Sequence, residues 1–180
     1  DIAIVSAAGR FELPALPAHP SKPSAQETYD SIVAPTLGWT LFGYEQPAGR
    51  LSKHLKDAVS AYNRKGVQRA LDRALEDAGK SGKKSAQGVG VPKVKLVNAP
   101  SSLGEGALAA ELSVTLTETS EEGEPSEGAT KPLKKETKGK PEKVVVKGYV
   151  FLVPDGSRTW LAIGALREPL LEQVLSVKRG

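Results

Sequence analysis

Two stretches of the chain alternate between apolar and polar residues. In the first, one set of alternate positions is apolar throughout: Leu108, Ala110, Leu112, Val114 and Leu116. In the second, apolar residues again occupy positions an even number of residues apart: Val144, Val146, Val150 and Leu152. Successive side chains of a β-strand point to opposite faces, so this pattern predicts two strands, each with a buried face.

A polar segment with segregated charge lies between these two strands. Residues 118–143 have no apolar periodicity. Glutamates fill the first half of the segment and lysines fill the second half. A sheet that accommodates such a sequence must hold it outside its core, so we predict a flexible charged insert at 118–143.

The N-terminal region has a different composition. Its apolar run Ile2-Ala3-Ile4-Val5 is followed by Phe11 and then by four prolines between Pro14 and Pro23. Proline fixes φ and removes a backbone donor, so we interpret residues 1–23 as an arm on an extended linker. Ser24 and Glu27 then have the spacing of a capping box. They predict a short helix that ends before Pro35.

The remaining patterns complete a prediction of the fold. They indicate a strand at 37–44, two helices separated by Gly66, a short strand at 91–97, a hairpin at 144–163 and a last helix that starts near Glu168. Successive strands joined by a hairpin and a long loop favour a mostly antiparallel sheet of four to five strands with helices packed on one face. We therefore expect a single α+β domain at 24–180.

Composition narrows the classes of function. Aromatic residues make up 5% of the chain, too few for large platforms that bind sugars or bases. The net charge of +4 is mild and spread, so we do not expect a nucleic acid as the partner. Cysteine is absent, which excludes disulfides and thiolate sites. No apolar run approaches the roughly 20 residues of a membrane span.

No arrangement of catalytic residues is convincing. The chain has two histidines: His19 lies in the proline-rich linker, and His54 lies at the edge of a helix face. The serines at 101 and 102 lack a nucleophile elbow, and residues 79–85 lack the spacing of a phosphate-binding loop. The glutamate pairs of the insert lack the ligand spacing of a calcium loop. We therefore predict a protein that is not an enzyme and that has no metal and no cofactor.

The leading hypothesis is an interaction or assembly protein, either an exported bacterial protein or a domain derived from a lipoprotein. An apolar arm can add a strand to the sheet edge of a neighbour, which would give association with a protein partner or with a second copy. The candidate partner-binding residues are Ile2, Ile4, Val5 and Phe11 in the arm and Lys134, Lys135 and Lys138 in the insert. We expect a periplasmic or outer-membrane-associated location rather than a cytoplasmic one.

Two alternatives remain open. The segment from Tyr149 to Gly164, followed by a helix, resembles the end of a pitrilysin-type peptidase half-domain, in which a hairpin is also followed by a closing helix. The zinc motif of that family has no counterpart here, so the resemblance implies a non-catalytic half-domain that binds extended peptide. The second alternative is a binder of anionic polymers, which would use Lys83, Lys84, the lysines at 93 and 95 and those of the insert.

Overall fold

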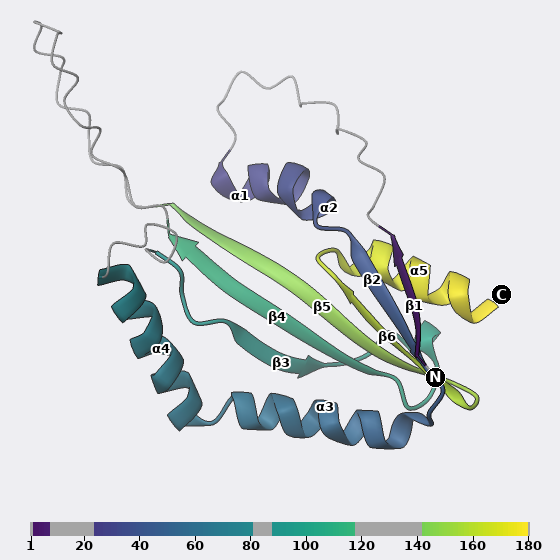
Figure 1. Cartoon of the computed structure of the whole chain (residues 1–180). Helices are drawn as coiled ribbons and strands as arrows, with labels where there is room; N and C mark the ends of the chain where they lie inside the picture. The colour runs from purple at the N-terminus through teal and green to yellow at the C-terminus, as the bar shows by residue number, and fades with distance from the viewer. Residues whose placement is uncertain (1, 8–23, 81–87, 118–141, 180) are drawn as a thin grey trace, which may run out of the picture.

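The computed structural model describes residues 2–7, 24–80, 88–117 and 142–179, with side chains except at 2–7 and Ile32. Its six strands form one antiparallel sheet in the order β1-β2-β6-β5-β4-β3 (Figure 1). The strands are β1 (Ile2–Ala7), β2 (Trp39–Tyr44), β3 (Lys93–Val97), β4 (Leu108–Thr117), β5 (Lys143–Asp155) and β6 (Arg158–Gly164). The predicted α+β fold with an antiparallel sheet is confirmed. Strands β2 to β6 lie in the predicted domain, and β1 adds a further strand at one edge.

The helices lie between and after the strands. They are α1 (Ala25–Thr28), the π-helical η1 (Tyr29–Val33), α2 (Ala34–Thr36), α3 (Ala48–Tyr62), α4 (Lys65–Lys80), the 3-10 turn η3 (Ser101–Leu103) and α5 (Arg167–Arg179). Elements α1, η1 and α2 follow one another without a break, so they form one helical segment, which we call the N-terminal helix.

The N-terminal helix begins at the predicted capping box. The Glu27 amide donates to Ser24 Oγ at 3.2 Å, and the Ser24 amide donates to the Glu27 carboxylate at 2.8 Å. The prediction that this helix ends before Pro35 is wrong, because it continues to Thr36. A π turn precedes the proline, with the Ala34 amide donating to the Tyr29 carbonyl. The helix thus widens just before the residue that has no amide to donate.

The N-terminal helix is fixed beside the part of β5 that β6 does not reach. Strand β6 pairs with β5 only from Tyr149 onward, whereas β4 pairs along β5 from Lys143. The Gln26 side chain accepts from the Val145 amide at 2.7 Å and donates to the Val145 carbonyl at 3.3 Å. This side chain therefore bonds the strand edge as a neighbouring strand would.

Helix α5 closes one face of the sheet. Its Leu170 and Val174 pack against Phe151, Val153 and Leu41 in a cluster of buried apolar residues. Burying a side chain of this size contributes roughly 1.5–3 kcal/mol. This face is therefore the hydrophobic core of the molecule.

Helices α3 and α4 lie along the opposite border from the N-terminal helix (Figure 1). The Tyr62 hydroxyl at the end of α3 donates to the Pro92 carbonyl at 2.8 Å, and the Asn63 side chain donates to the Val94 carbonyl at 2.8 Å. These bonds occupy backbone acceptors at the edge strand β3. An edge strand with free backbone groups can otherwise pair with a strand of another chain. Helix α4 packs chiefly against α3, and none of its described residues is buried.

Candidate functional site

The face of the sheet opposite α5 is apolar and only partly covered, since its Ala110, Val144 and Leu152 are buried while other residues of the face are exposed. The pairing register places alternate residues of β2 to β6 together on this face. We call it the apolar face and define it by Phe42, Val94, Leu96, Leu108, Ala110, Leu112, Val114, Leu116, Val144, Val146, Val150, Leu152, Leu161 and Ile163. Within β2 to β6 no charged residue shares this face. It therefore has the composition of a core surface without a complete covering layer.

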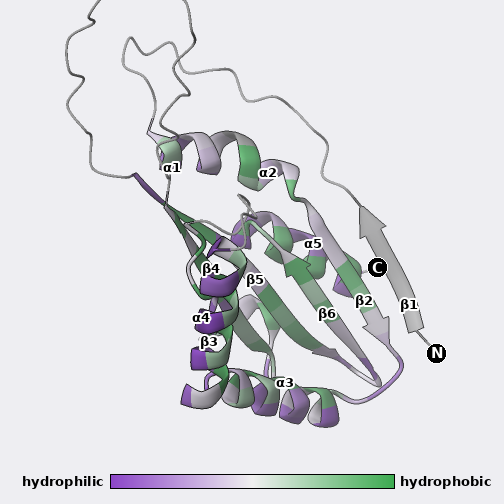
Figure 2. Cartoon of the chain, turned by 60° about the vertical axis from the view of Figure 1, so that its left-hand side comes forward, coloured by the Kyte–Doolittle hydropathy of each residue, from purple (hydrophilic) through white to green (hydrophobic). Residues whose placement is uncertain are grey.

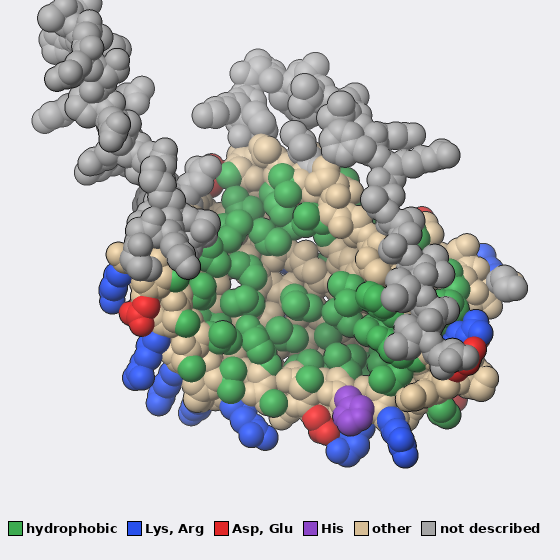
Figure 3. Space-filling model, viewed as in Figure 1, with side chains coloured by type: hydrophobic (Ala, Val, Ile, Leu, Met, Phe, Trp, Pro, Cys, Tyr) green, Lys and Arg blue, Asp and Glu red, His purple; other side chains and the backbone are tan. Residues whose placement is uncertain are grey.

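Several large side chains of the apolar face are exposed. The exposed fractions are 43% for Ile163, 42% for Leu96, 37% for Leu112 and 36% for Leu116. Figure 3 shows apolar side chains gathered across the middle of the molecule, which is hollowed between the N-terminal helix and the α3–α4 pair. Large contiguous apolar patches are uncommon on monomeric proteins and mark interaction sites.

Helices α3 and α4 extend this surface at its border. Val59 of α3 is buried, but Leu71 and Leu75 of α4 are only half-buried, and Val67 is 39% exposed. Figure 2 shows hydrophobic strands bordered by helices that carry hydrophilic residues. The apolar side of α4 thus remains partly open beside the apolar face.

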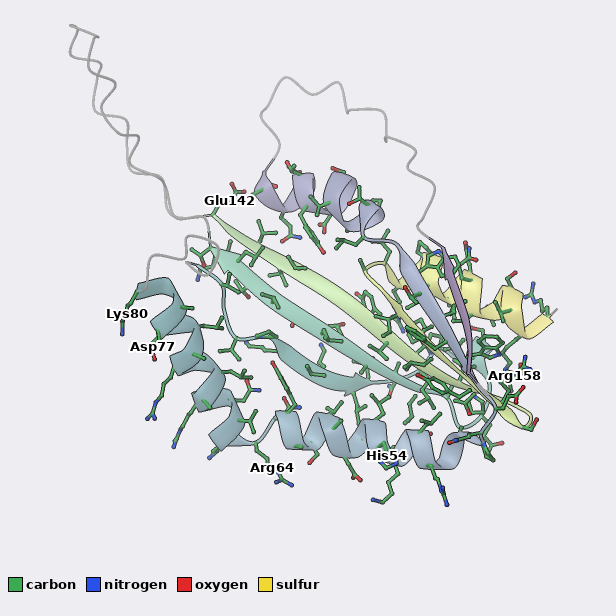
Figure 4. All side chains as sticks on the ribbon, viewed as in Figure 1. His54, Arg64, Asp77, Lys80, Glu142 and Arg158 are labelled. Carbon is green, nitrogen blue, oxygen red and sulfur yellow. The ribbon has the colours of Figure 1, made fainter. Side chains whose placement is uncertain are left out.

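The two borders of the hollow differ in charge. Residues 48–80, which hold α3 and α4, contain eight Lys or Arg and four Asp or Glu, a net charge of +4. Residues 24–37, which hold the N-terminal helix, contain Glu27 and Asp30 and no Lys or Arg, a net charge of −2. Figure 4 shows Arg64 at the corner between α3 and α4 and Lys80 at the end of α4, both directed away from the sheet. The two helical borders of the hollow therefore carry opposite net charge, with these two cations on the outer side of the α3–α4 pair.

The predicted partner-binding residues are not assembled into a site in the described part of the chain. Ile2, Ile4 and Val5 lie on β1, where they pair with Tyr44, Phe42 and Leu41 of β2 in the same molecule. Phe11, Lys134, Lys135 and Lys138 lie outside the described residues.

Among the residues considered for catalysis, those that the structure describes do not come together; His19 and residues 81–85 lie outside the described residues. His54 is exposed on α3 (Figure 4), and Ser101 and Ser102 are exposed on η3. The described residues contain no cluster of three or more His, Cys, Asp or Glu side chains suited to a metal ion. Lys53 lowers the pKa of Asp57 through a 2.8 Å hydrogen bond, but both side chains are exposed on α3. This pair is an ordinary contact on a helix surface.

A cavity of about 430 Å³ lies between the N-terminal helix, β5 and the start of α5. Its polar lining includes Tyr29, Asp30, Lys147, Arg167 and Glu168. Tyr29 is only 8% exposed, and among the described residues its hydroxyl has no hydrogen-bond partner. Burial raises the pKa of Tyr29, and the nearby backbone of Lys147 partly opposes that shift.

The sequence contained a signal for the apolar face that the strand pattern alone did not reveal. Residues 150–153 are a continuous apolar run on β5, in which Val150 and Leu152 belong to the apolar face while Phe151 and Val153 belong to the core. A continuous run of this kind indicates a strand that is apolar on both sides. The cavity around Tyr29 had no comparable signal, because three elements distant in sequence form it.

Comparisons with protein-family models, with curated proteins and with solved structures gave no match. No described helix has both the length and the apolar character needed to cross a membrane.

Proposed function

We propose that this protein is a non-enzymatic binding protein whose apolar face receives an amphipathic helix of a protein partner. The observation that supports the proposal is the apolar face itself, a strand surface without charged residues that helix α5 does not cover. An apolar sheet face is normally buried under a second layer of secondary structure. A partner helix would supply that layer.

The shape of the surface favours a helix over other occupants. The hollow lies between two helical borders, the N-terminal helix and the α3–α4 pair (Figure 3). An amphipathic helix would bury its apolar stripe on the sheet and keep its polar side in water. An acyl chain on this open face would leave one side in contact with water. The openness of the site therefore supports a protein partner.

The charge of the borders favours an acidic partner helix. The net charge of +4 on residues 48–80 attracts acidic side chains, while the N-terminal helix repels them. Such complementarity mainly raises the rate of association and fixes the orientation of the partner. Because these cations are exposed, salt should weaken the attraction over a Debye length of about 8–10 Å.

Strand exchange through the arm is a second candidate function. The observation that favours it is the ladder between β1 and β2, which pairs residues 2–7 with residues 39–44 at the edge of the sheet. The same ladder can form with β2 of a second copy, since a sheet edge accepts any strand of suitable register.

The first proposal is tested with designed peptides of about 18 residues, or five helical turns. Two peptides share one leucine-rich face and carry either glutamate or lysine on the other face. We expect the acidic peptide to bind at least about tenfold more tightly at low salt, as measured by fluorescence anisotropy. Binding to anionic lipid vesicles but to neither peptide would contradict a protein partner.

Substitutions locate the binding surface. Leu112→Glu and Ile163→Glu place a charge on the apolar face and should abolish peptide binding. Leu37→Glu is the matched control, because Leu37 is 58% exposed but lies between α2 and β2, outside the apolar face. Equal loss of binding in the control would show that the effect does not depend on this surface.

A further inference from the structure

We propose that the cavity lined by Tyr29, Asp30, Lys147, Arg167 and Glu168 binds a small zwitterion, a molecule that carries a carboxylate and an ammonium group, as a free amino acid does. The cavity lies beside Tyr149, on the side of β5 that also carries Phe151 and Val153. The apolar face is on the other side of this strand, although Tyr29 also packs against Val144 and Val146 at the end of that face. The polar groups of the cavity take no part in the proposed helix binding, so the two proposals can fail separately.

The cavity has the size and the support of a ligand site. Its volume of about 430 Å³ lies in the range of about 300–1,000 Å³ that is typical of small-molecule pockets. Its walls are tied together, since Gln26 bonds the Val145 backbone and the Ala25 amide donates to the Glu142 carboxylate at 2.8 Å. A ligand would therefore meet walls that are already in place.

The Tyr29 hydroxyl indicates what the ligand must offer. This group is more than nine-tenths buried and has no hydrogen-bond partner among the described residues. Buried hydroxyls almost always have a partner, because an unpaired one loses its bonds to water without compensation. A hydroxyl can both donate and accept, whereas the nearby backbone amide of Lys147 can only donate. The Tyr29 hydroxyl therefore still lacks a group to which it can donate. The matching ligand group is an acceptor oxygen.

Two cations at the cavity favour a ligand whose acceptor oxygen carries negative charge. Lys147 and Arg167 both line the cavity, and neither forms an ion pair with a described residue. Arg167 is also the first residue of α5, whose amino-terminal end carries partial positive charge. Hydrogen bonds from cationic donors to a carboxylate are stronger than neutral ones. A carboxylate is therefore the favoured acceptor.

Two carboxylates at the same cavity call for a positive group on the ligand. Glu168 lines the cavity without an ion pair among the described residues, and Asp30 accepts a bond from the Gln26 side chain at 3.0 Å. A simple anion would meet repulsion from these groups, whereas an ammonium group would be attracted to them. Two charges of each sign thus match a zwitterion better than an anion.

Solution NMR of the full chain tests the inference. L-alanine and L-glutamine are titrated into protein labelled with ¹⁵N, with acetate and propylamine as ligands of a single charge. We expect saturable shifts of amides around Tyr29, Lys147 and Arg167 with the amino acids, and at least tenfold weaker binding of acetate and propylamine. The absence of saturable shifts with both L-alanine and L-glutamine, or acetate binding as tightly as L-alanine, would overturn the inference.

Variants separate ligand binding from a structural role. Tyr29→Phe and Arg167→Gln should each raise the Kd by about tenfold, because the first removes a donor to the carboxylate and the second removes the positive charge beside it. Arg179→Gln is the matched control at the other end of α5 and should leave the Kd unchanged. At the same concentration, L-alanine should raise the Tm of the wild type by more than that of Tyr29→Phe, since stabilisation by a ligand falls as its Kd rises. An unchanged Kd in both cavity variants would contradict the proposed site.

Discussion

Trp160 fixes the geometry of the sheet near the β5–β6 turn. Its indole N–H donates to the Asp155 carboxylate at 3.1 Å, and the Arg158 guanidinium lies 5.6 Å from the ring centroid. Cation–π contacts of this kind contribute about 0.5–1 kcal/mol at exposed sites. Gly43 pairs with Trp160 across the sheet, and a Cβ added there would lie 2.8 Å from the ring. The ring is buried and held on both sides, so it has little freedom to move.

Gly43→Ala should therefore destabilise the protein. We expect a loss of about 1–3 kcal/mol in the free energy of unfolding, measured with a chemical denaturant, because the core is overpacked. Gly49→Ala is the matched control, since a Cβ at Gly49 of α3 meets nothing within 4 Å. The control should be stabilising by about 0.5–1 kcal/mol, because alanine favours a helix. Two equal effects would contradict the packing explanation.

The unpaired hydroxyl of Tyr29 should reduce stability in the absence of a ligand. Tyr29→Phe removes the hydroxyl but keeps the ring, so we expect an increase of about 1 kcal/mol in the free energy of unfolding. Tyr29→Ala also removes the ring and should cost about 3–5 kcal/mol, as truncation of a buried aromatic does. A destabilised phenylalanine variant would show that the hydroxyl has a bonding partner in the native protein.

The raised pKa of Tyr29 also predicts a dependence on alkaline pH. The hydroxyl titrates near pH 10 in the unfolded chain and at higher pH in the native state, since burial disfavours the anion. Above about pH 10 the unfolded state therefore binds fewer protons, and stability falls as pH rises through the native pKa. Thermal melts from pH 9 to 11 should show a smaller fall for Tyr29→Phe. Identical slopes would contradict the shift.

At the level of elements, local patterns were enough to predict most of the secondary structure. Alternation at 108–116 predicted β4, and the Ser24–Glu27 spacing predicted the start of the N-terminal helix. The predicted hairpin and closing helix are present as β5, β6 and α5. These elements are also the basis of the resemblance to pitrilysin-type half-domains, for which the comparisons provide no family match. Hairpins, helix caps and strands can be predicted from the sequence because the residues that determine them are close together along the chain.

Elements that depend on distant contacts were harder to predict. The helix beyond Pro35 is held by Gln26, which bonds Val145 on a strand more than one hundred residues later. The arm was predicted, but its pairing with β2 depends on which sheet edge lies within reach. Neither contact has a signal in the residues around it, because each depends on tertiary structure.

The pairing of β1 with β2 predicts that the arm can be removed from the chain and will then bind to the truncated protein as a separate peptide. A chain that lacks residues 1–23 should stay folded, since strands β2 to β6 and α5 form the core cluster with one another. A synthetic peptide of residues 1–10 should then bind the truncated protein, as calorimetry would show. A peptide with the same residues in scrambled order is the control and should not bind.

Light scattering distinguishes the two uses of the arm. If β1 pairs within one molecule, the full chain is a monomer, and truncation does not lower its mass beyond the residues removed. A full-length dimer that becomes a monomer on truncation would instead support exchange of the arm between copies.

At the scale of the whole molecule, the sheet has apolar residues on both faces, but a helix lies across the middle of only one face. Helix α5 covers the core face, while α3, α4 and the N-terminal helix border the other face (Figure 1). The apolar positions of β4 and β5 were visible in the sequence. Whether a helix covers them depends on the paths of α3 and α4, which no local pattern determines.

The most direct test of the account is methyl NMR of the full chain during titration with the acidic amphipathic peptide. We expect the methyl signals of Leu112, Leu116 and Ile163 to shift together along one saturation curve, while those of Leu170 and Val174 in the core stay in place. Added salt should weaken binding without changing which methyl groups respond. Binding at the apolar face would be contradicted if its methyl signals stayed fixed at saturating peptide, or if the peptide shifted signals only elsewhere in the molecule.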